Sequence, residues 1–174
     1  ELNVNSVPSQ LIALAGNADN FYYLADGTIG KINTAHLEYI ELINDGDITG
    51  KNLLLGYTYH PDQPDLIYYG NETLGLIKDI GGENTLNTLS MKTITGVSLS
   101  DIDDDSRVEI LVAQENEELS IYNSQLILEN NFPVELGTEL TGAPLSCNIN
   151  KGGNEIFPLS VNGELYGIND RGQQ

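Results

Sequence analysis

The sequence is short of several residue types, and each shortage excludes something. Its 174 residues include no tryptophan, one methionine and one cysteine. A single cysteine, Cys147, cannot form a disulfide within the chain. Because Cys147 lies near the end of an apolar run, we expect a small buried residue rather than a nucleophile.

Basic residues are also scarce, with 7 Lys and Arg against 26 Asp and Glu, for a net charge of −19. Such a surface repels phosphate backbones and anionic headgroups, so we expect no nucleic-acid partner and no binding to a membrane surface. No stretch approaches the ~18 apolar residues of a membrane span, so we also expect no membrane insertion. Cations are the natural partners of this surface, although a high negative charge can serve solubility alone.

What the sequence does contain is a fourfold internal repeat. A short strand-like signature recurs with its central aliphatic residue at Ile29, Leu74, Leu119 and Leu165, in steps of 45, 45 and 46 residues. An independent marker, Ile or Leu followed by Thr-Gly, recurs in steps of 46 and 46. Repeats of about 40–50 residues are typical of architectures in which each unit must stack on its neighbours to bury its apolar faces.

The third repeat shows what one unit contains. Thr95–Ile102 alternates as a strand does, and an acidic loop follows it. Val108–Ala113 is a nearly continuous apolar run with a β-branched bias, which is typical of a strand covered on both faces. Leu119–Tyr122 predicts a third strand, and the segment around Phe132–Val134 predicts a weaker edge strand. Four short antiparallel strands in each repeat are typical of a β-propeller blade.

We therefore predict an all-β, β-propeller-type fold of four blades, each about 45 residues long. The chain is read as one repeat domain with approximate blades at 1–45, 46–91, 92–137 and 138–174. The last unit lacks an outer strand, which indicates an incomplete ring or a fragment. Open blade edges seek partners, so we expect self-association or a neighbouring domain there. A β-sandwich built from similar hairpins is the remaining alternative for the fold.

The acidic loop is the segment with a defined chemical interpretation. Carboxylates stand at loop positions 1, 3, 5 and 9, which are Asp101, Asp103, Asp105 and Glu109, and position 7, Arg107, can offer its backbone carbonyl. Oxygen ligands at this density suit Ca²⁺, which takes 6–8 of them. The alternative is that the aspartates only accept hydrogen bonds from backbone amides, as in Asx turns.

Placed between the first two strands of a unit, this loop resembles the calcium loops of FG-GAP and VCBS-type repeats, the family that includes the integrin alpha-subunit propeller. The loop is not an EF-hand, because its twelfth position is Val112 instead of a glutamate. The family usually has glycines at loop positions 4 and 6, where this chain has Asp104 and Ser106. The resemblance implies one Ca²⁺ site, an extracellular or cell-surface location, and a role in adhesion or partner binding.

The function we expect is that of a non-catalytic extracellular binding or scaffold module with a structural calcium loop. No nucleophile, base or transition-metal cluster stands at a recognisable spacing, so we do not expect an enzyme. The alternative is a part of a secreted propeller-fold enzyme, such as a polysaccharide lyase or hydrolase, whose active site lies outside this chain. Blades of the pyrroloquinoline-quinone type rank last, because they typically carry tryptophan.

A ligand-binding face is predicted on the side of the acidic loop. Tyr57, Tyr59 and His60 fall on that side and combine aromatic rings, a histidine and the predicted cation. We expect a protein or carbohydrate ligand there, although tyrosines at alternating strand positions also serve packing.

Overall fold

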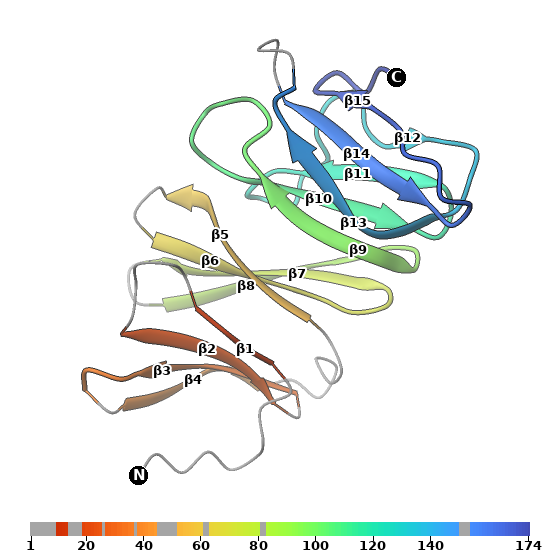
Figure 1. Ribbon diagram of the computed structural model, residues 1–174. Coiled ribbons are helices and arrows are strands. Elements are labelled where there is room, and N and C mark those ends of the chain that lie inside the picture. The colour runs from red at the N-terminus through yellow and green to blue at the C-terminus, as the bar shows by residue number, and fades with distance from the viewer. Residues whose placement is uncertain are drawn as a thin grey trace.

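The computed structural model describes residues 10–13, 19–25, 27–36, 38–44, 52–60, 63–80, 83–149 and 154–174 (Figure 1). Within these ranges the secondary structure consists of strands, turns and bends, and no helix could cross a membrane. The strands form four separate antiparallel sheets in chain order, which we call blades 1 to 4. The all-β prediction is therefore confirmed. The predicted boundary at residue 45 falls outside the described residues.

Each sheet is built from strands that are consecutive in the sequence. The strands of blades 1 and 2 are β1 (Gln10–Ile12), β2 (Asn20–Ala25), β3 (Thr28–Asn33), β4 (Glu38–Asn44), β5 (Asn52–His60), β6 (Gln63–Tyr69), β7 (Thr73–Ile80) and β8 (Glu83–Ser90). Those of blades 3 and 4 are β9 (Ile94–Ser100), β10 (Glu109–Gln114), β11 (Glu118–Tyr122), β12 (Val134–Glu135), β13 (Leu140–Cys147), β14 (Glu155–Ser160) and β15 (Ile168–Asn169).

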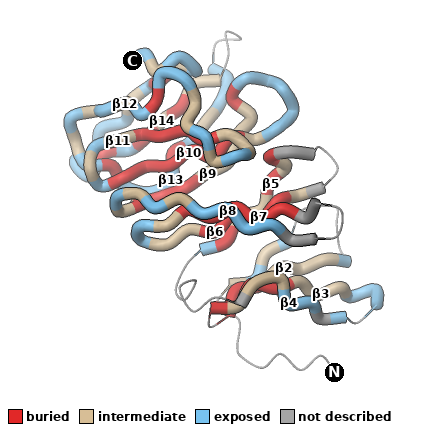
Figure 2. The backbone as a smooth tube through the Cα atoms, turned by 180° about the vertical axis from the view of Figure 1, so that it is seen from behind, coloured by how far each residue is buried: buried red, intermediate tan, exposed pale blue. Residues whose placement is uncertain are grey.

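The blades stack one on the next, and the ring stays open. The first and last blades lie at opposite ends of the molecule in both views (Figures 1 and 2). Blade 4 has three strands among the described residues, whereas the other blades have four. Its signature segment is also less regular, because Leu165 forms only an isolated bridge with Leu159 before β15 begins.

The described residues form three hydrophobic cores, each between two successive blades. Strand β6 shows how one strand serves two of them: Tyr68 belongs to the core shared with blade 1, and its neighbour Ile67 to the core shared with blade 3. In β10, Ile110 likewise packs in the core with blade 2, and Leu111 packs in the core with blade 4. Because successive side chains of a strand point to opposite faces, a strand buried on both faces needs a continuous apolar run.

Cys147 contradicts the expectation of a buried residue, because it is exposed. It pairs with Glu155 at the end of β13, in the last sheet of the stack. Because Ile156 faces the core shared with blade 3, Cys147 lies on the outer side of blade 4, which no described sheet covers.

A tyrosine packed over a glycine explains part of the repeated signature. Tyr68 pairs with Gly75 across β6 and β7, and its ring occupies the space that a side chain at Gly75 would need. Tyr23 and Gly30 form the same pair in blade 1. Both tyrosines are buried, so the glycine makes room for a large ring within the stack.

We predict that Gly75→Ala lowers the free energy of unfolding by about 1–3 kcal/mol, because the added methyl group forces the Tyr68 ring out of its place. Gly167→Ala is the matched control, since its nearest neighbour would be Phe157 Cε1 at an ordinary 3.6 Å. Urea denaturation of both variants measures the difference. Equal stability of the two would show that the ring does not depend on the glycine.

Candidate functional site

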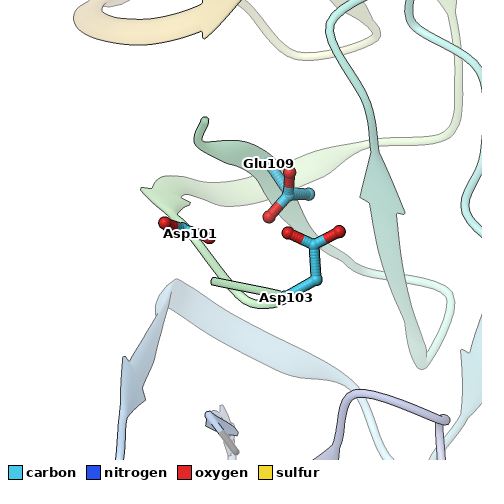
Figure 3. A group of neighbouring side chains, drawn as sticks. All are labelled: Asp101, Asp103 and Glu109. Atoms are coloured by element: carbon cyan, nitrogen blue, oxygen red, sulfur yellow. The ribbon is translucent and has the colours of Figure 1, made fainter. Parts of the chain in front are cut away.

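Three acidic side chains converge where β9 ends and β10 begins. Asp101 follows β9, Glu109 is the first residue of β10, and Ser100 pairs with Glu109 across the two strands. Asp101, Asp103 and Glu109 each offer a carboxylate oxygen, and these oxygens lie within 4.8 Å of one another. In Figure 3 the carboxylates of Asp103 and Glu109 point toward one another. The antiparallel register thus closes the loop and brings its two ends together.

The backbone of the loop is held by its own aspartates. The carboxylate of Asp101 accepts hydrogen bonds from the backbone N–H groups of Asp105 at 3.1 Å and Ser106 at 2.9 Å. Asp103 also accepts one from Asp105, at 3.2 Å. Asp104 and Ser106 have φ angles of 63° and 71°, at the two loop positions where the resembling family has glycine. Each left-handed non-glycine residue costs about 1 kcal/mol. The Asx-turn bonds act against this cost.

Glu109 is the buried member of the group, with an exposed fraction of 8%. Its pKa is raised to about 7, chiefly by burial and to a smaller extent by the charges of Asp103, Asp105 and Asp101. The backbone N–H of Ile102 donates to Glu109 Oε2 at 2.8 Å and opposes the rise in pKa. Near neutral pH this carboxyl group is therefore partly protonated, and a cation that binds to it must displace the proton.

The other predicted ligands lie differently. Asp105 is not part of the converging group: its carboxylate accepts a hydrogen bond from the backbone N–H of Arg107 at 2.8 Å, and it lies 3.9 Å from the Arg107 guanidinium Nε. The structure therefore brings together three of the four predicted carboxylates. The fourth stabilises the turn on the exposed side of the loop.

Two hydrogen bonds attach the loop to the neighbouring blades. The backbone N–H of Val108 donates to the carbonyl of Tyr57 in blade 2 at 2.9 Å. Asn154 in blade 4 donates from Nδ2 to the carbonyl of Asp101 at 2.6 Å. Tyr57 thus lies beside the acidic loop. The side chains of Tyr59 and His60 lie outside the described residues, although their backbone belongs to β5.

A pocket of about 140 Å³ opens beside the loop. Its lining residues are Ile102, Asp103, Glu109, Glu129, Asn130, Asn131 and Asp170. Four of these side chains are carboxylates. Glu129 and Asp170 were not singled out from the sequence, because they reach the pocket from loops of blades 3 and 4 that carry no recognisable motif.

A second polar group was also missed by sequence reasoning. Thr58, Asp65 and Lys78 are buried in blade 2, with exposed fractions of 1%, 5% and 6%. The Thr58 hydroxyl donates to Asp65 Oδ2 at 2.5 Å. Burial lowers the pKa of Lys78, and the charge of Asp65 partly offsets this. The sequence signal for this group is a charged residue within each of two largely apolar strands, Asp65 in β6 and Lys78 in β7.

A larger pocket, of about 300 Å³, lies at the junction of blades 2 and 3. Glu72, Lys92, Thr93, Glu115 and Asn116 line it. It lies at the opposite end of the strands from the acidic loop, because Glu115 and Asn116 form the turn between β10 and β11. Both polar atoms of the Asn116 amide are buried without a hydrogen-bond partner in the structure.

Comparisons with known proteins identify the fold and not a family. No family model matches the chain, and no curated protein matches it. The fold is similar to that of BBS1N in complex with ARL6DN, soaked with mercury, with a TM-score of 0.66 and 14% identity over 98% of this chain and 54% of that chain. A crystal of the same complex soaked with lead gives a TM-score of 0.66 and 14% identity over 93% of this chain and 47% of that chain.

The chain therefore spans about half the length of these structures. A protein of unknown function from Bacteroides caccae is more distant, with a TM-score of 0.44 and 13% identity over 90% of this chain and 59% of that chain. The four stacked antiparallel sheets and the likeness to BBS1N confirm a β-propeller-type fold in an open, incomplete ring. The narrower resemblance to FG-GAP and VCBS repeats stays a prediction.

We predict that Glu109→Gln stabilises the metal-free protein above pH 7 and not below pH 5. The folded-state pKa of Glu109, about 7, exceeds its ordinary 4.5. The favourable contribution of the neutral acid is thus complete below 4.5 and is lost as the pH rises through about 7. Glutamine stays neutral and can still accept the hydrogen bond from Ile102.

The expected gain at pH 8 is at most about 3 kcal/mol, because the folded-state pKa of about 7 exceeds 4.5 by about 2.5 and each unit corresponds to 1.36 kcal/mol. Urea unfolding in the presence of a chelator, at pH 5 and pH 8, measures it. A stability difference between variant and parent that is the same at both values would contradict the raised pKa.

Proposed function

We propose that this chain is a non-catalytic module that binds another protein through the face carrying the acidic loop. This face is built from three blades that are joined at the acidic loop. The loop of blade 3 is bonded to blade 2 through Tyr57 and to blade 4 through Asn154, so three blades contribute to one surface. Binding and catalytic residues are disproportionately found on loops that a rigid scaffold positions.

Two further points support a protein partner. BBS1N, whose fold is similar, was solved in complex with ARL6DN, so a propeller domain of this kind can take part in a complex. The net charge of −19 and the four carboxylates of the pocket favour a partner with a basic surface, because complementary charge speeds association and suppresses wrong partners.

The proposal includes one structural Ca²⁺ at the loop. Asp101, Asp103 and Glu109 fit this ion, since hard oxygen ligands at close range are what calcium selects. The carbonyl of Arg107 would complete the set proposed from the sequence, and Asp105 would join only by leaving its bonds to Arg107. The ion would neutralise mutually repelling carboxylates and clamp the connection between β9 and β10.

A structural calcium loop favours an extracellular or cell-surface location, as proposed from the family resemblance. Sites of extracellular modules bind calcium with dissociation constants of about 10⁻⁴–10⁻³ M, and such sites fill only where calcium is abundant. Ligand at a tenfold excess over its dissociation constant adds about 1.4 kcal/mol to the stability of the folded state.

We predict that calcium raises the melting temperature of the parent protein and that Asp103→Asn abolishes this rise. Asp103 belongs to the converging group, and the amide removes one charge that would face the ion. Asp104→Asn is the matched control: its side chain lies in the same loop and outside the group, and asparagine tolerates the positive φ.

Differential scanning calorimetry with millimolar calcium, and again with a chelator, gives the comparison. Asp104→Asn should respond as the parent does. A parent whose melting temperature is indifferent to both additions would leave the loop as an Asx-turn structure without an ion.

We also predict that Tyr59→Ala with His60→Ala weakens partner binding at least about tenfold without lowering the melting temperature, since a tenfold loss corresponds to about 1.4 kcal/mol of contact energy. Immobilised parent and double variant are compared for capture of secreted and cell-surface proteins of the source organism, and on a glycan array. A basic protein retained by the parent alone supports the proposal. Retention of glycans without any protein, or identical capture by both, contradicts it.

A further inference from the structure

The outer strand of blade 2, β8, has an edge with which no other strand pairs in the described part of the chain. It is the last strand of its sheet, and all eight of its residues pair with β7. Figure 2 shows this strand at the surface, and its exposed side chains are Thr85, Leu86, Asn87, Thr88 and Ser90. The blades stack through the faces of their sheets, so the neighbours of blade 2 cover its faces and leave this edge open.

The pairing of β7 with β8 determines which backbone groups of β8 point outward. At the end of the ladder where β7 begins, the N–H of Met91 donates to the carbonyl of Glu72 at 3.0 Å, so these two residues are a hydrogen-bonded pair. Such pairs recur at every second residue of an antiparallel ladder, and the next one joins Leu74 to Leu89. The residues of β8 between these pairs turn their N–H and C=O groups away from β7. Those on the outer edge are Leu86, Thr88 and Ser90.

The last strands of the other sheets carry features that discourage pairing with a further strand, and β8 does not. Strand β4 contains Glu38 and Glu41, and its pairing with β3 has a shift of register. Strands β12 and β15 have two residues each, and Pro133 precedes β12. Charges, bulges, proline and short length are the means by which natural sheets protect their edges. Between Glu83 and Lys92, by contrast, the sequence of β8 has no charged residue, glycine or proline.

We propose that this edge binds an extended, uncharged segment of another protein, which adds to blade 2 as a fifth strand beyond β8. The outward N–H and C=O groups of Leu86, Thr88 and Ser90 supply the main-chain hydrogen bonds of such an addition. Threonine, valine and isoleucine in the added strand suit this edge, because the exposed side chains of β8 are polar and uncharged or aliphatic. The contact goes beyond the proposed function, since it lies on blade 2 and not on the acidic loop of blade 3.

The charge pattern of the chain favours a neutral segment over an acidic segment and over a second copy. With a net charge of −19, this protein repels acidic partners, and two copies repel each other. Between Glu83 and Lys92 the edge offers no charge with which a charged side chain of the added strand could pair. A neutral strand therefore loses the least on binding here, because no charge is removed from water without a partner.

A synthetic peptide with the sequence Lys-Thr-Val-Thr-Val-Thr-Val-Lys, blocked at both ends, is the probe, and its lysines serve solubility. NMR follows the hydrogen exchange of the ¹⁵N-labelled protein with and without this peptide. In the free protein the outward amides of Leu86, Thr88 and Ser90 should exchange fast, whereas those of Asn87 and Leu89 should be protected by their bonds to β7. Peptide at a tenfold excess over its dissociation constant should slow the three outward amides about tenfold.

Thr88→Pro should abolish this protection, because proline lacks the outward N–H, whereas the ladder with β7 does not use that group. Thr88→Val is the matched control: it keeps the N–H and a branched side chain, and its affinity for the peptide should stay within about twofold of the parent. Leu86→Lys keeps every backbone group and adds a charge to the edge, so it should raise the dissociation constant at least about tenfold. The melting temperature of each variant checks its fold, and Leu86→Lys tests the same edge independently of proline.

A peptide with proline in place of each valine has the same charge and should protect no amide of β8. Outward amides that are already protected in the free protein, or that stay unprotected at millimolar peptide, overturn the proposal. Equal binding by Thr88→Pro and Thr88→Val overturns it as well. Asp103→Asn, and Tyr59→Ala with His60→Ala, should bind the peptide as the parent does, so failure of the acidic-loop proposal would leave this result unchanged.

Discussion

Blades 2 and 3 are apolar on both faces, and the blades on either side cover them. Strand β10 states the constraint most plainly, because all six of its residues, from Glu109 to Gln114, are buried. Alternate side chains of such a strand pack against the preceding blade and the following blade, so a blade on its own would expose both of its apolar faces. The chain therefore folds by stacking its blades, and the period of the sequence repeat reflects this stacking. Figure 2 shows the buried residues concentrated in the strands of the stacked blades.

The acidic site depends on this stacking. A loop of eight residues with two left-handed non-glycine positions is costly on its own, yet it lies between blades 2 and 4, each of which shares a core with blade 3. Bonds from Val108 to Tyr57 and from Asn154 to Asp101 use that fixed spacing. Burial of Glu109 follows from the same cause, since β10 begins inside the stack and its first residue enters with it. The chemistry of the loop is thus a consequence of the blade interfaces.

The sequence predicted what depends on periodicity and missed what depends on three-dimensional neighbours. The steps between Ile29, Leu74, Leu119 and Leu165 were enough for four all-β units, because stacking imposes the same burial in each. The meeting of Asp101 with Glu109 follows from pairing adjacent strands. Glu129 and Asp170 could not be assigned to the pocket, because loops of different blades meet only after the stack forms. Cys147 was misjudged because apolar neighbours indicate burial only if a further layer exists to cover them.

Hydrogen bonds within the protein hold the shape of the acidic loop. The remaining unfavourable interaction is the repulsion between its carboxylates. The Asp101 carboxylate already accepts hydrogen bonds from the backbone N–H groups of Asp105 and Ser106, so the loop conformation does not require a bound ion. Glu109, however, is buried beside other carboxylates, and burial together with their charges raises its pKa and disfavours its charged form. A proton relieves the repulsion by neutralising one acid, whereas a divalent cation relieves it for the whole group. Both act on the same carboxylates, so proton and cation compete there, and a cation would stabilise a loop whose shape is already set.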